Sequence, residues 1–212
     1  CYHFLTRTLH VTDGIVGIDS NPPEIFDFDP TPLLFHSRER GDEPLIDSIE
    51  FRKKGWARLV LFSSFLKPGK LKIPPLKQIF KYSFKKDLCN MRAHFGIYPF
   101  LWDENWDSSL EDIMGEDMPK IQIAPVLQKL IFPRSKEKLI LWLENIKTFK
   151  DVKYLIPAHF SAPIDFTVED SQKLINDINS EKWDKLPEDN KFLINLYKRL
   201  FELGIIPKEV NI

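Results

Sequence analysis

The sequence contains little cysteine, little glycine and no long apolar run. The two cysteines, Cys1 and Cys89, are too few for a disulfide framework and belong to no Cys/His cluster, which favours a reducing compartment and predicts Cys89 to be a small buried hydrophobe. The eight glycines form neither of the common phosphate-binding patterns. Because no eighteen consecutive residues are apolar and no signal pattern opens the chain, neither a transmembrane segment nor a targeting signal is expected.

The composition does supply enough apolar material for a globular core. Of the 212 residues, 43% are hydrophobic and 29% are charged, and the formal net charge is −1. A chain of this length fits one large domain, or one domain with an appendage. So small a net charge gives no indication of a nucleic-acid or membrane partner for the chain as a whole, and no nucleic-acid partner is expected.

The N-terminal segment has the alternating pattern of a β-hairpin. Residues 2–5 and 8–18 predict two antiparallel strands, and because the first residues already have a strand pattern, we expect the chain to begin inside a domain. The second strand contains Asp13-Gly14, a pair that typically marks a bend. We therefore expect the Asp13 carboxylate at a strand end. The five prolines of residues 21–44 predict a loop.

Apolar residues at helical spacing predict most of the remaining elements. The expected elements are a helix over residues 48–66, a helix over 135–149 that leads into a strand over 152–156, a helix that opens with a capping box of Thr167 and Asp170, and a last helix over 188–203. Residues 121–132 are ambiguous between strand and helix. The strand over 152–156 is expected to join the sheet of the hairpin.

Two residues stand out because they lie at strand ends, where ligands collect in layered α/β folds. They are Asp13 at the predicted bend and His159 just after the strand over 152–156. A carboxylate oxygen and an imidazole nitrogen can both bind a metal, but a catalytic zinc needs three protein ligands, and the other histidines form no ligand pair. The alternative is that Asp13 accepts backbone N–H groups and that His159 is a hydrogen-bonded core residue.

Two other arrangements near these residues have less support. His10 and Asp13 are three residues apart, so on one strand they face opposite sides unless the bend turns the chain. Ser161 follows His159 closely, but the sequence has no Gly-x-Ser-x-Gly elbow and no sign of an oxyanion loop.

The charges are segregated along the chain. Residues 52–92 carry twelve Lys or Arg and one acid, whereas residues 96–118 carry seven acids and no Lys or Arg. Either the two blocks neutralise each other, or the basic block contacts an acidic protein or an anionic membrane surface. The second interpretation predicts that several lysines lie on one exposed face, drawn from Lys67, Lys70, Lys72, Lys77, Lys81, Lys85 and Lys86.

Several stretches resemble a known family and cover nearly the whole chain in order. They are residues 6–13, 29–36, 54–68, 95–100, 123–126 and 156–164. They resemble an uncharacterised family of cyanobacteria and plastids, domain of unknown function 4336, which is similar to metallo-β-lactamase-like hydrolases. That resemblance implies that Val11-Thr12-Asp13 delivers a bridging aspartate and that Pro157-Ala158-His159 delivers the last metal histidine.

One departure separates the chain from those hydrolases. The HxHxDH ligand motif belongs upstream of residue 1, and this chain does not supply it. The expected fold class is therefore α/β (α+β), the C-terminal part of a degenerate metallo-β-lactamase-like αββα sandwich with a large, mostly helical insertion. Residues 1–20 and 121–180 are expected to form the half domain, residues 21–120 a charged insertion and residues 181–212 a C-terminal helical extension.

The sequence leaves open whether the protein is an enzyme. It favours a non-catalytic binding or assembly module in photosynthetic cells, cytoplasmic or peripheral to the thylakoid membrane, with no cofactor in this chain. The alternative is a metal-dependent hydrolase of an ester, thioester or phosphodiester. In that case upstream residues would complete a zinc or iron site together with Asp13 and His159.

Overall fold

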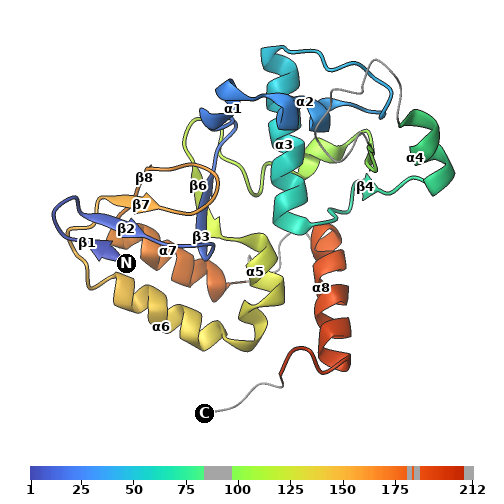
Figure 1. The fold of residues 1–212 in the computed structure, drawn as a ribbon. Coiled ribbons are helices and arrows are strands. Elements are labelled where there is room, and N and C mark those ends of the chain that lie inside the picture. Colours follow the sequence, from blue (N-terminus) through green and yellow to red (C-terminus); the bar gives the residue numbers. More distant parts are fainter. Residues whose placement is uncertain (84–96, 181–182, 184–186, 208–212) are drawn as a thin grey trace.

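Residues 1–83, 97–180, 183 and 187–207 are described by a computed structural model, which shows a mixed α/β fold (Figure 1). The helices are α1 (Ile25–Phe28), α2 (Thr31–Ser37), α3 (Ile49–Phe65), α4 (Leu76–Tyr82), α5 (Pro125–Leu130), α6 (Lys136–Ile146), α7 (Val168–Ile178) and α8 (Pro187–Glu202), with 3-10 turns η3 (Trp106–Ser109) and η4 (Phe132–Arg134). The strands are β1 (Tyr2–His3), β2 (Thr8–His10), β3 (Ile15–Ile18), β4 (Leu71–Lys72), β5 (Leu101–Trp102), β6 (Lys120–Ile123), β7 (Tyr154–Ile156) and β8 (Ile164–Asp165). Within these residues, no helix has both the length and the apolar character needed to cross a bilayer.

The N-terminal hairpin belongs to a four-stranded sheet in the order β1-β2-β7-β8. β1 pairs with β2 antiparallel, and β2 pairs with β7 parallel, so that Leu9 lies beside Leu155. Helices α6 and α7 pack on this sheet, and their apolar side chains form one buried cluster with these two leucines. The predicted hairpin is thus confirmed, and so is the strand that joins it after α6.

The predicted break at Asp13-Gly14 divides the second strand completely. Beyond it, β3 leaves the first sheet and pairs antiparallel with β6 in a separate two-stranded sheet. Successive side chains of a strand face opposite sides, so Ile15 packs in the cluster with α6 and α7, while Val16 and Ile18 pack in a second cluster with α2 and α3. The prediction that all of residues 8–18 pair within the hairpin was wrong, because β3 is buried on both faces between two cores.

The prediction of a loop over residues 21–44 was also wrong, since this segment contains α1 and α2. Pro30 lies at the N-cap of α2 and Pro32 lies in its first turn. Proline breaks a helix interior, but in the first turn its missing N–H removes no intrahelical hydrogen bond. The buried residues of α2, among them Leu33 and Phe35, then pack against α3.

The other helices confirm the boundaries expected from capping and proline. The Ser48 side chain accepts a hydrogen bond from the N–H of Phe51 at 3.2 Å at the start of α3, and the predicted capping box opens α7. The ambiguous segment becomes a strand and then a helix, because Pro125 takes the first position of α5. Cys89 lies outside the described residues.

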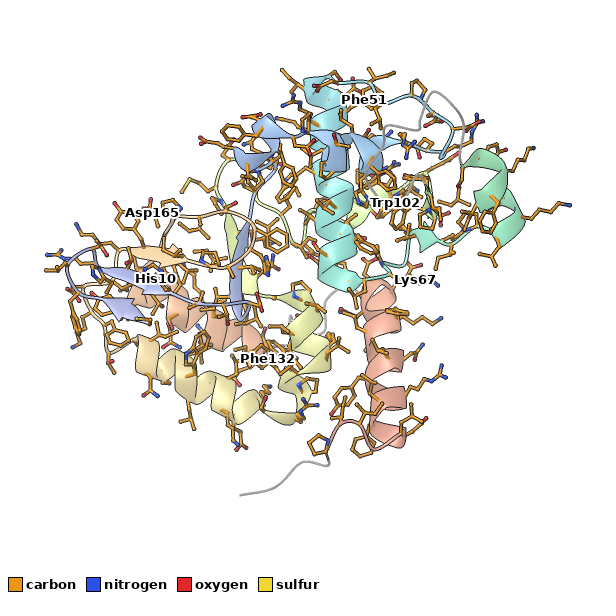
Figure 2. All side chains as sticks on the ribbon, in the orientation of Figure 1. His10, Phe51, Lys67, Trp102, Phe132 and Asp165 are labelled. Atoms are coloured by element: carbon orange, nitrogen blue, oxygen red, sulfur yellow. The ribbon has the colours of Figure 1, made fainter. Side chains whose placement is uncertain are left out.

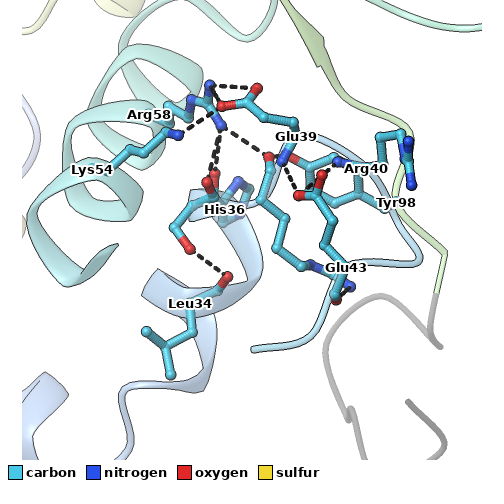
Figure 3. A network of polar contacts seen from close by, with 10 residues as sticks. Leu34, His36, Glu39, Arg40, Glu43, Lys54, Arg58 and Tyr98 are labelled. Carbon is cyan, nitrogen blue, oxygen red and sulfur yellow. Dashed lines mark hydrogen bonds and ion pairs between the residues drawn. The ribbon is translucent and has the colours of Figure 1, made fainter. Parts of the chain in front are cut away.

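A buried arginine joins α2 to α3 (Figure 3). Arg58, in α3, has only 1% of its surface exposed. Its Nη1 donates to the carbonyl oxygens of residues 36–38 at 3.4, 3.3 and 2.9 Å. These carbonyls close the C-terminal end of α2, where unpaired oxygens and the helix dipole favour a cation.

Glu39 completes the charge balance of this junction. Both of its carboxylate oxygens accept from Nη2 of Arg58 at 2.8 Å, and Lys54 forms an ion pair with it at 2.6 Å. Desolvation by burial raises the pKa of Glu39, but the Lys54 hydrogen bond and the Arg58 charge together outweigh it, so that the pKa is lowered.

A second buried arginine, Arg38, supports the same junction. Its guanidinium lies 4.8 Å from the ring centre of Phe35 and 4.9 Å from that of Tyr98, and it donates to the carbonyl oxygen of Gly41 at 2.9 Å. The Tyr98 hydroxyl donates to the carbonyl oxygen of Arg38, and desolvation by burial raises the pKa of Tyr98. The two arginines therefore fix the chain that leaves α2.

Substitution of Gly55 tests the close approach of α3 to α2. A Cβ at this position would lie 1.8 Å from the carbonyl oxygen of Leu33, a backbone atom that cannot move without displacing α2. We expect Gly55→Ala to lower the free energy of unfolding in urea by roughly 1–3 kcal/mol, even though alanine is the better helix former. The control is Gly14→Ala, whose Cβ would meet Trp142 at an ordinary 3.5 Å and should change stability far less. Equal losses of stability in Gly55→Ala and Gly14→Ala would contradict the close approach of α3 to α2.

Substitution of Glu39 tests the charge balance. Because its pKa is lowered in the folded protein, the ionised carboxylate stabilises the fold above the unfolded pKa, and this contribution is lost as the pH falls through the folded pKa. Glu39→Gln should cost roughly 1 kcal/mol at neutral pH, because water screens the half-exposed carboxylate, and the difference from wild type should shrink below about pH 4. Glu104→Gln, at an exposed position, is the control. A pH-independent difference would contradict an ionic role.

Candidate functional site

Asp13 and His159 meet where the chains leaving β2 and β7 separate. The N–H of Ala158 donates to the carbonyl oxygen of Thr12 at 3.2 Å, and a parallel bridge joins Gly17 to Phe160. Between these two contacts, one chain has the four residues 13–16, whereas the other has only His159. Asp13 lies between β2 and β3, and His159 follows β7, so both residues lie near strand ends, as the sequence predicted.

The two side chains are in direct contact at the surface. Nε2 of His159 lies 3.0 Å from Oδ1 of Asp13, and the two side chains are 67% and 53% exposed, respectively. His159 is therefore not a core residue, and that alternative was wrong. An imidazole against a carboxylate can exchange a proton or contribute to a metal site.

The neighbouring residues anchor this corner of the fold. Phe160 has a positive φ of 68°, and its ring packs near that of Trp56 at 6.0 Å. The Ser161 hydroxyl donates to Oδ2 of Asp19 at 2.8 Å, and Trp56 Nε1 donates to the carbonyl oxygen of Asp19 at 3.0 Å. Ser161 is thus hydrogen-bonded to the side chain of Asp19, whose backbone carbonyl contacts Trp56 of α3, and this gives Ser161 a structural role.

Asp13 and His159 are too few ligands to form a metal site by themselves. The residues described in the structure include no group of three or more His, Cys, Asp or Glu that could hold an ion. His10 contacts the Thr8 hydroxyl at 3.1 Å through Nε2, and the structure does not bring it to Asp13. Since a catalytic zinc needs three protein ligands, Asp13 and His159 do not fit zinc or iron without further ligands.

The structure places five of the seven predicted lysines, while Lys85 and Lys86 lie outside the described residues. Lys70 forms an ion pair with Glu188 at 3.5 Å, and Lys72 forms one with Asp103 at 2.7 Å. Lys67, Lys77 and Lys81 are exposed and form no ion pair with another described residue. Lys67 lies just beyond the end of α3, next to the start of α8 (Figure 2).

The basic block from residue 52 to 92 divides into two parts. Three of its four early members are paired with acids from residues 27–47: Arg52 contacts Asp27 and Asp47, whereas Lys54 and Arg58 contact Glu39. Among the acids of residues 96–118, Asp103 forms an ion pair with Lys72, a described lysine of the block. Apart from the exposed Lys53 on α3, the lysines of the block that form no ion pair with a described residue lie around β4 and α4.

Exposed apolar side chains accompany these lysines, and the sequence analysis missed them by counting charge alone. Ile73 is 65% exposed and Leu76 is 70% exposed, and Phe80 is also exposed. Leu76 and Phe80 are four residues apart on α4, which places them on one face of the helix. That spacing of Leu76 and Phe80 was the signal available in the sequence.

A cavity of about 190 Å³ lies between β6, α5, α7 and the start of α8. Leu174, Ile178 and Trp183 supply apolar walls, and Gln122 and Gln128 supply polar ones. The side-chain amides of both glutamines donate to backbone carbonyl oxygens, which fixes their orientation. The cavity is separate from the Asp13–His159 pair and was not expected from the sequence.

Comparison with known families gives one result. The family model described as "Domain of unknown function (DUF4336)" matches residues 1–176. The chain belongs to this family. Searches of curated proteins and of solved structures found no match. Helix α8 lies beyond the matched residues, although its buried Asp189 accepts a hydrogen bond from the N–H of Gly69 at 2.7 Å and so attaches it to the family region.

Elemental analysis tests the metal interpretation. We expect the purified chain to hold well below one zinc or iron per molecule, because two exposed ligands leave a first-row metal mostly hydrated. His159→Gln should not change the metal content, and it should alter stability by only about 0–1 kcal/mol, as for an exposed ion pair. About one tightly held metal per chain, lost in His159→Gln, would contradict this expectation.

Proposed function

We propose that the protein is a non-catalytic binding module that docks onto an anionic partner. The docking surface comprises β4, α4 and the residues before them, with Lys67, Lys70, Lys72, Lys77 and Lys81 and the apolar Ile73 and Leu76; we call it the β4–α4 surface. The observation that carries the proposal is the exposure of Lys67, Lys77 and Lys81 without an ion pair to another described residue. Exposed cations of this kind attract anionic partners from a distance.

The geometry of α4 supports this role. Lys77 and Lys81 are four residues apart and share one face of the helix, opposite the buried Ile79. Charges on one face act together on a partner within the Debye length of about 8–10 Å, whereas charges on opposed faces do not. Figure 1 shows α4 at the outer edge of the molecule, away from the four-stranded sheet.

The proposed function includes a fold type and a cellular location. The contact between Asp13 and His159 supports a degenerate metallo-β-lactamase-like sandwich, because the resemblance assigns both residues to one site. On this proposal the module works in photosynthetic cells, against an acidic protein or an anionic membrane such as the thylakoid surface.

A metal-dependent hydrolase of an ester, thioester or phosphodiester is the second candidate. Its support is the 3.0 Å contact between Asp13 and His159, which brings two residues of the ligand types used by such enzymes to one exposed point. Further ligands would have to come from outside the described residues. Metal bound at one equivalent to the longest natural form of the protein would favour this candidate.

Charge reversal tests the docking function. Binding should be measured to two probes, poly-L-glutamate and vesicles that contain phosphatidylglycerol, at low and high salt. We expect binding to at least one of them to weaken steeply with salt and to be lost in the triple variant Lys67→Glu, Lys77→Glu, Lys81→Glu. The melting temperature should hardly change, because these exposed lysines form no ion pair with a described residue.

A matched triple variant separates local from overall charge. Lys138→Glu, Lys150→Glu and Lys198→Glu change the net charge equally at exposed positions on other parts of the chain. This variant should retain most of the binding. If neither probe binds wild-type protein at low salt, or if the two triple variants lose binding equally, the docking function is wrong.

A further inference from the structure

We infer that the partner of the β4–α4 surface is an anionic lipid bilayer, and that Ile73 and Leu76 insert into it; this inference rests on the proposed docking function. Lysines alone would suit any anionic partner. The deciding feature is that aliphatic side chains lie directly beside them in a region that projects from the molecule.

The apolar side chains favour a bilayer over the alternatives. Ile73 and Leu76 are among the most exposed apolar residues described, and they are aliphatic, so they cannot stack on nucleic-acid bases. A helix that lies in a membrane interface buries such side chains at the boundary between headgroups and acyl chains, while neighbouring lysines remain at the phosphates. An acidic protein would attract the lysines equally, but the cores of protein–protein interfaces are enriched in aromatic residues, Met and Arg and depleted of Lys, which lysines beside Ile and Leu match less well.

The arrangement of α4 matches this mode of binding. Leu76 and Phe80 form one stripe along the helix, and Lys77 and Lys81 form the adjacent stripe. Lys72 precedes Ile73 directly but is paired with Asp103, so the cations of this stripe are Lys77 and Lys81. Long lysine side chains can extend along the apolar surface to place their ammonium groups at lipid phosphates.

The body of the protein holds this element in place. Ile79 is buried and attaches α4 to the protein, while β4 pairs with β5 through Leu71 and Trp102, both buried. The apolar stripe therefore does not need to fold on binding, as an unattached amphipathic peptide would. Figure 1 shows α4 at the edge of the fold, on the side away from the four-stranded sheet and α6, where a flat bilayer would meet neither of them.

Vesicle binding of apolar variants tests the inference. Co-sedimentation should be measured with phosphatidylcholine vesicles, with and without phosphatidylglycerol. We expect wild-type protein to bind only the anionic vesicles, and the double variant Ile73→Ser, Leu76→Ser to bind them roughly ten-fold or more weakly, because two aliphatic side chains no longer leave water. The control Ile25→Ser, Leu141→Ser removes two exposed aliphatic side chains elsewhere and should bind as wild type does.

Depth measurement distinguishes insertion from attraction of charge. Tryptophan introduced by Leu76→Trp should be quenched by lipids brominated on their acyl chains, whereas tryptophan introduced by Leu141→Trp should not. Salt-dependent binding that the serine variants leave unchanged, with no quenching at position 76, would overturn insertion while the docking function stands. Binding to poly-L-glutamate but not to anionic vesicles would identify an acidic protein as the partner and would also overturn the inference. Binding to neither probe would overturn the docking function itself.

Discussion

The fold depends on the buried guanidinium of Arg58 at the C-terminal end of α2. A charge inside a protein is tolerated only when hydrogen bonds and an opposite charge replace water, and here the carbonyls of residues 36–38 and the carboxylate of Glu39 do so. This requirement fixes the position of α2 on α3, and Gly55 allows the two backbones to meet. Helix α3 is thereby buried on more than one side, which explains why its second half is apolar on nearly every face.

The position of α3 in turn determines where the β4–α4 surface lies. The helix ends at Leu66, whose positive φ of 58° turns the chain toward Gly69 and β4. Helix α8 holds this turn from the other side, because Asp189 accepts the N–H of Gly69 and Glu188 pairs with Lys70. The position of the β4–α4 surface, for which docking is proposed, therefore depends on a helix that lies beyond the matched family region.

Much of the fold followed from local signals, whereas the junction at Arg58 did not. The start of α3 near Ser48, the capping box of α7 and the joining of β7 to the sheet of the hairpin were predicted because each depends on neighbouring residues or on the order of elements. So were the positions of Asp13 and His159 at strand ends. A buried arginine is different, because its partners precede it by about twenty residues, and its identity alone gives no indication of burial. Helix α2 was not predicted either. Its prolines lie at the start of the helix, where they are tolerated, but their identity alone does not show that position.

The ion pair of Arg58 also reduces the number of cations in residues 52–92 that are available to a partner. Twelve cations against one acid indicate a strong patch, but Arg52, Lys54 and Arg58 are neutralised by acids of residues 27–47, and Lys70 and Lys72 are paired as well. Three exposed lysines remain described around β4 and α4, and near an anionic surface each contributes about 1 kcal/mol. About 3 kcal/mol corresponds to weak, millimolar-range attraction. Burial of Ile73 and Leu76 in lipid, at about 1.5–3 kcal/mol for each fully buried side chain, would add at least as much. If the proposed membrane docking is correct, the lysines would therefore select an anionic partner, and the apolar side chains would supply at least half of the binding free energy.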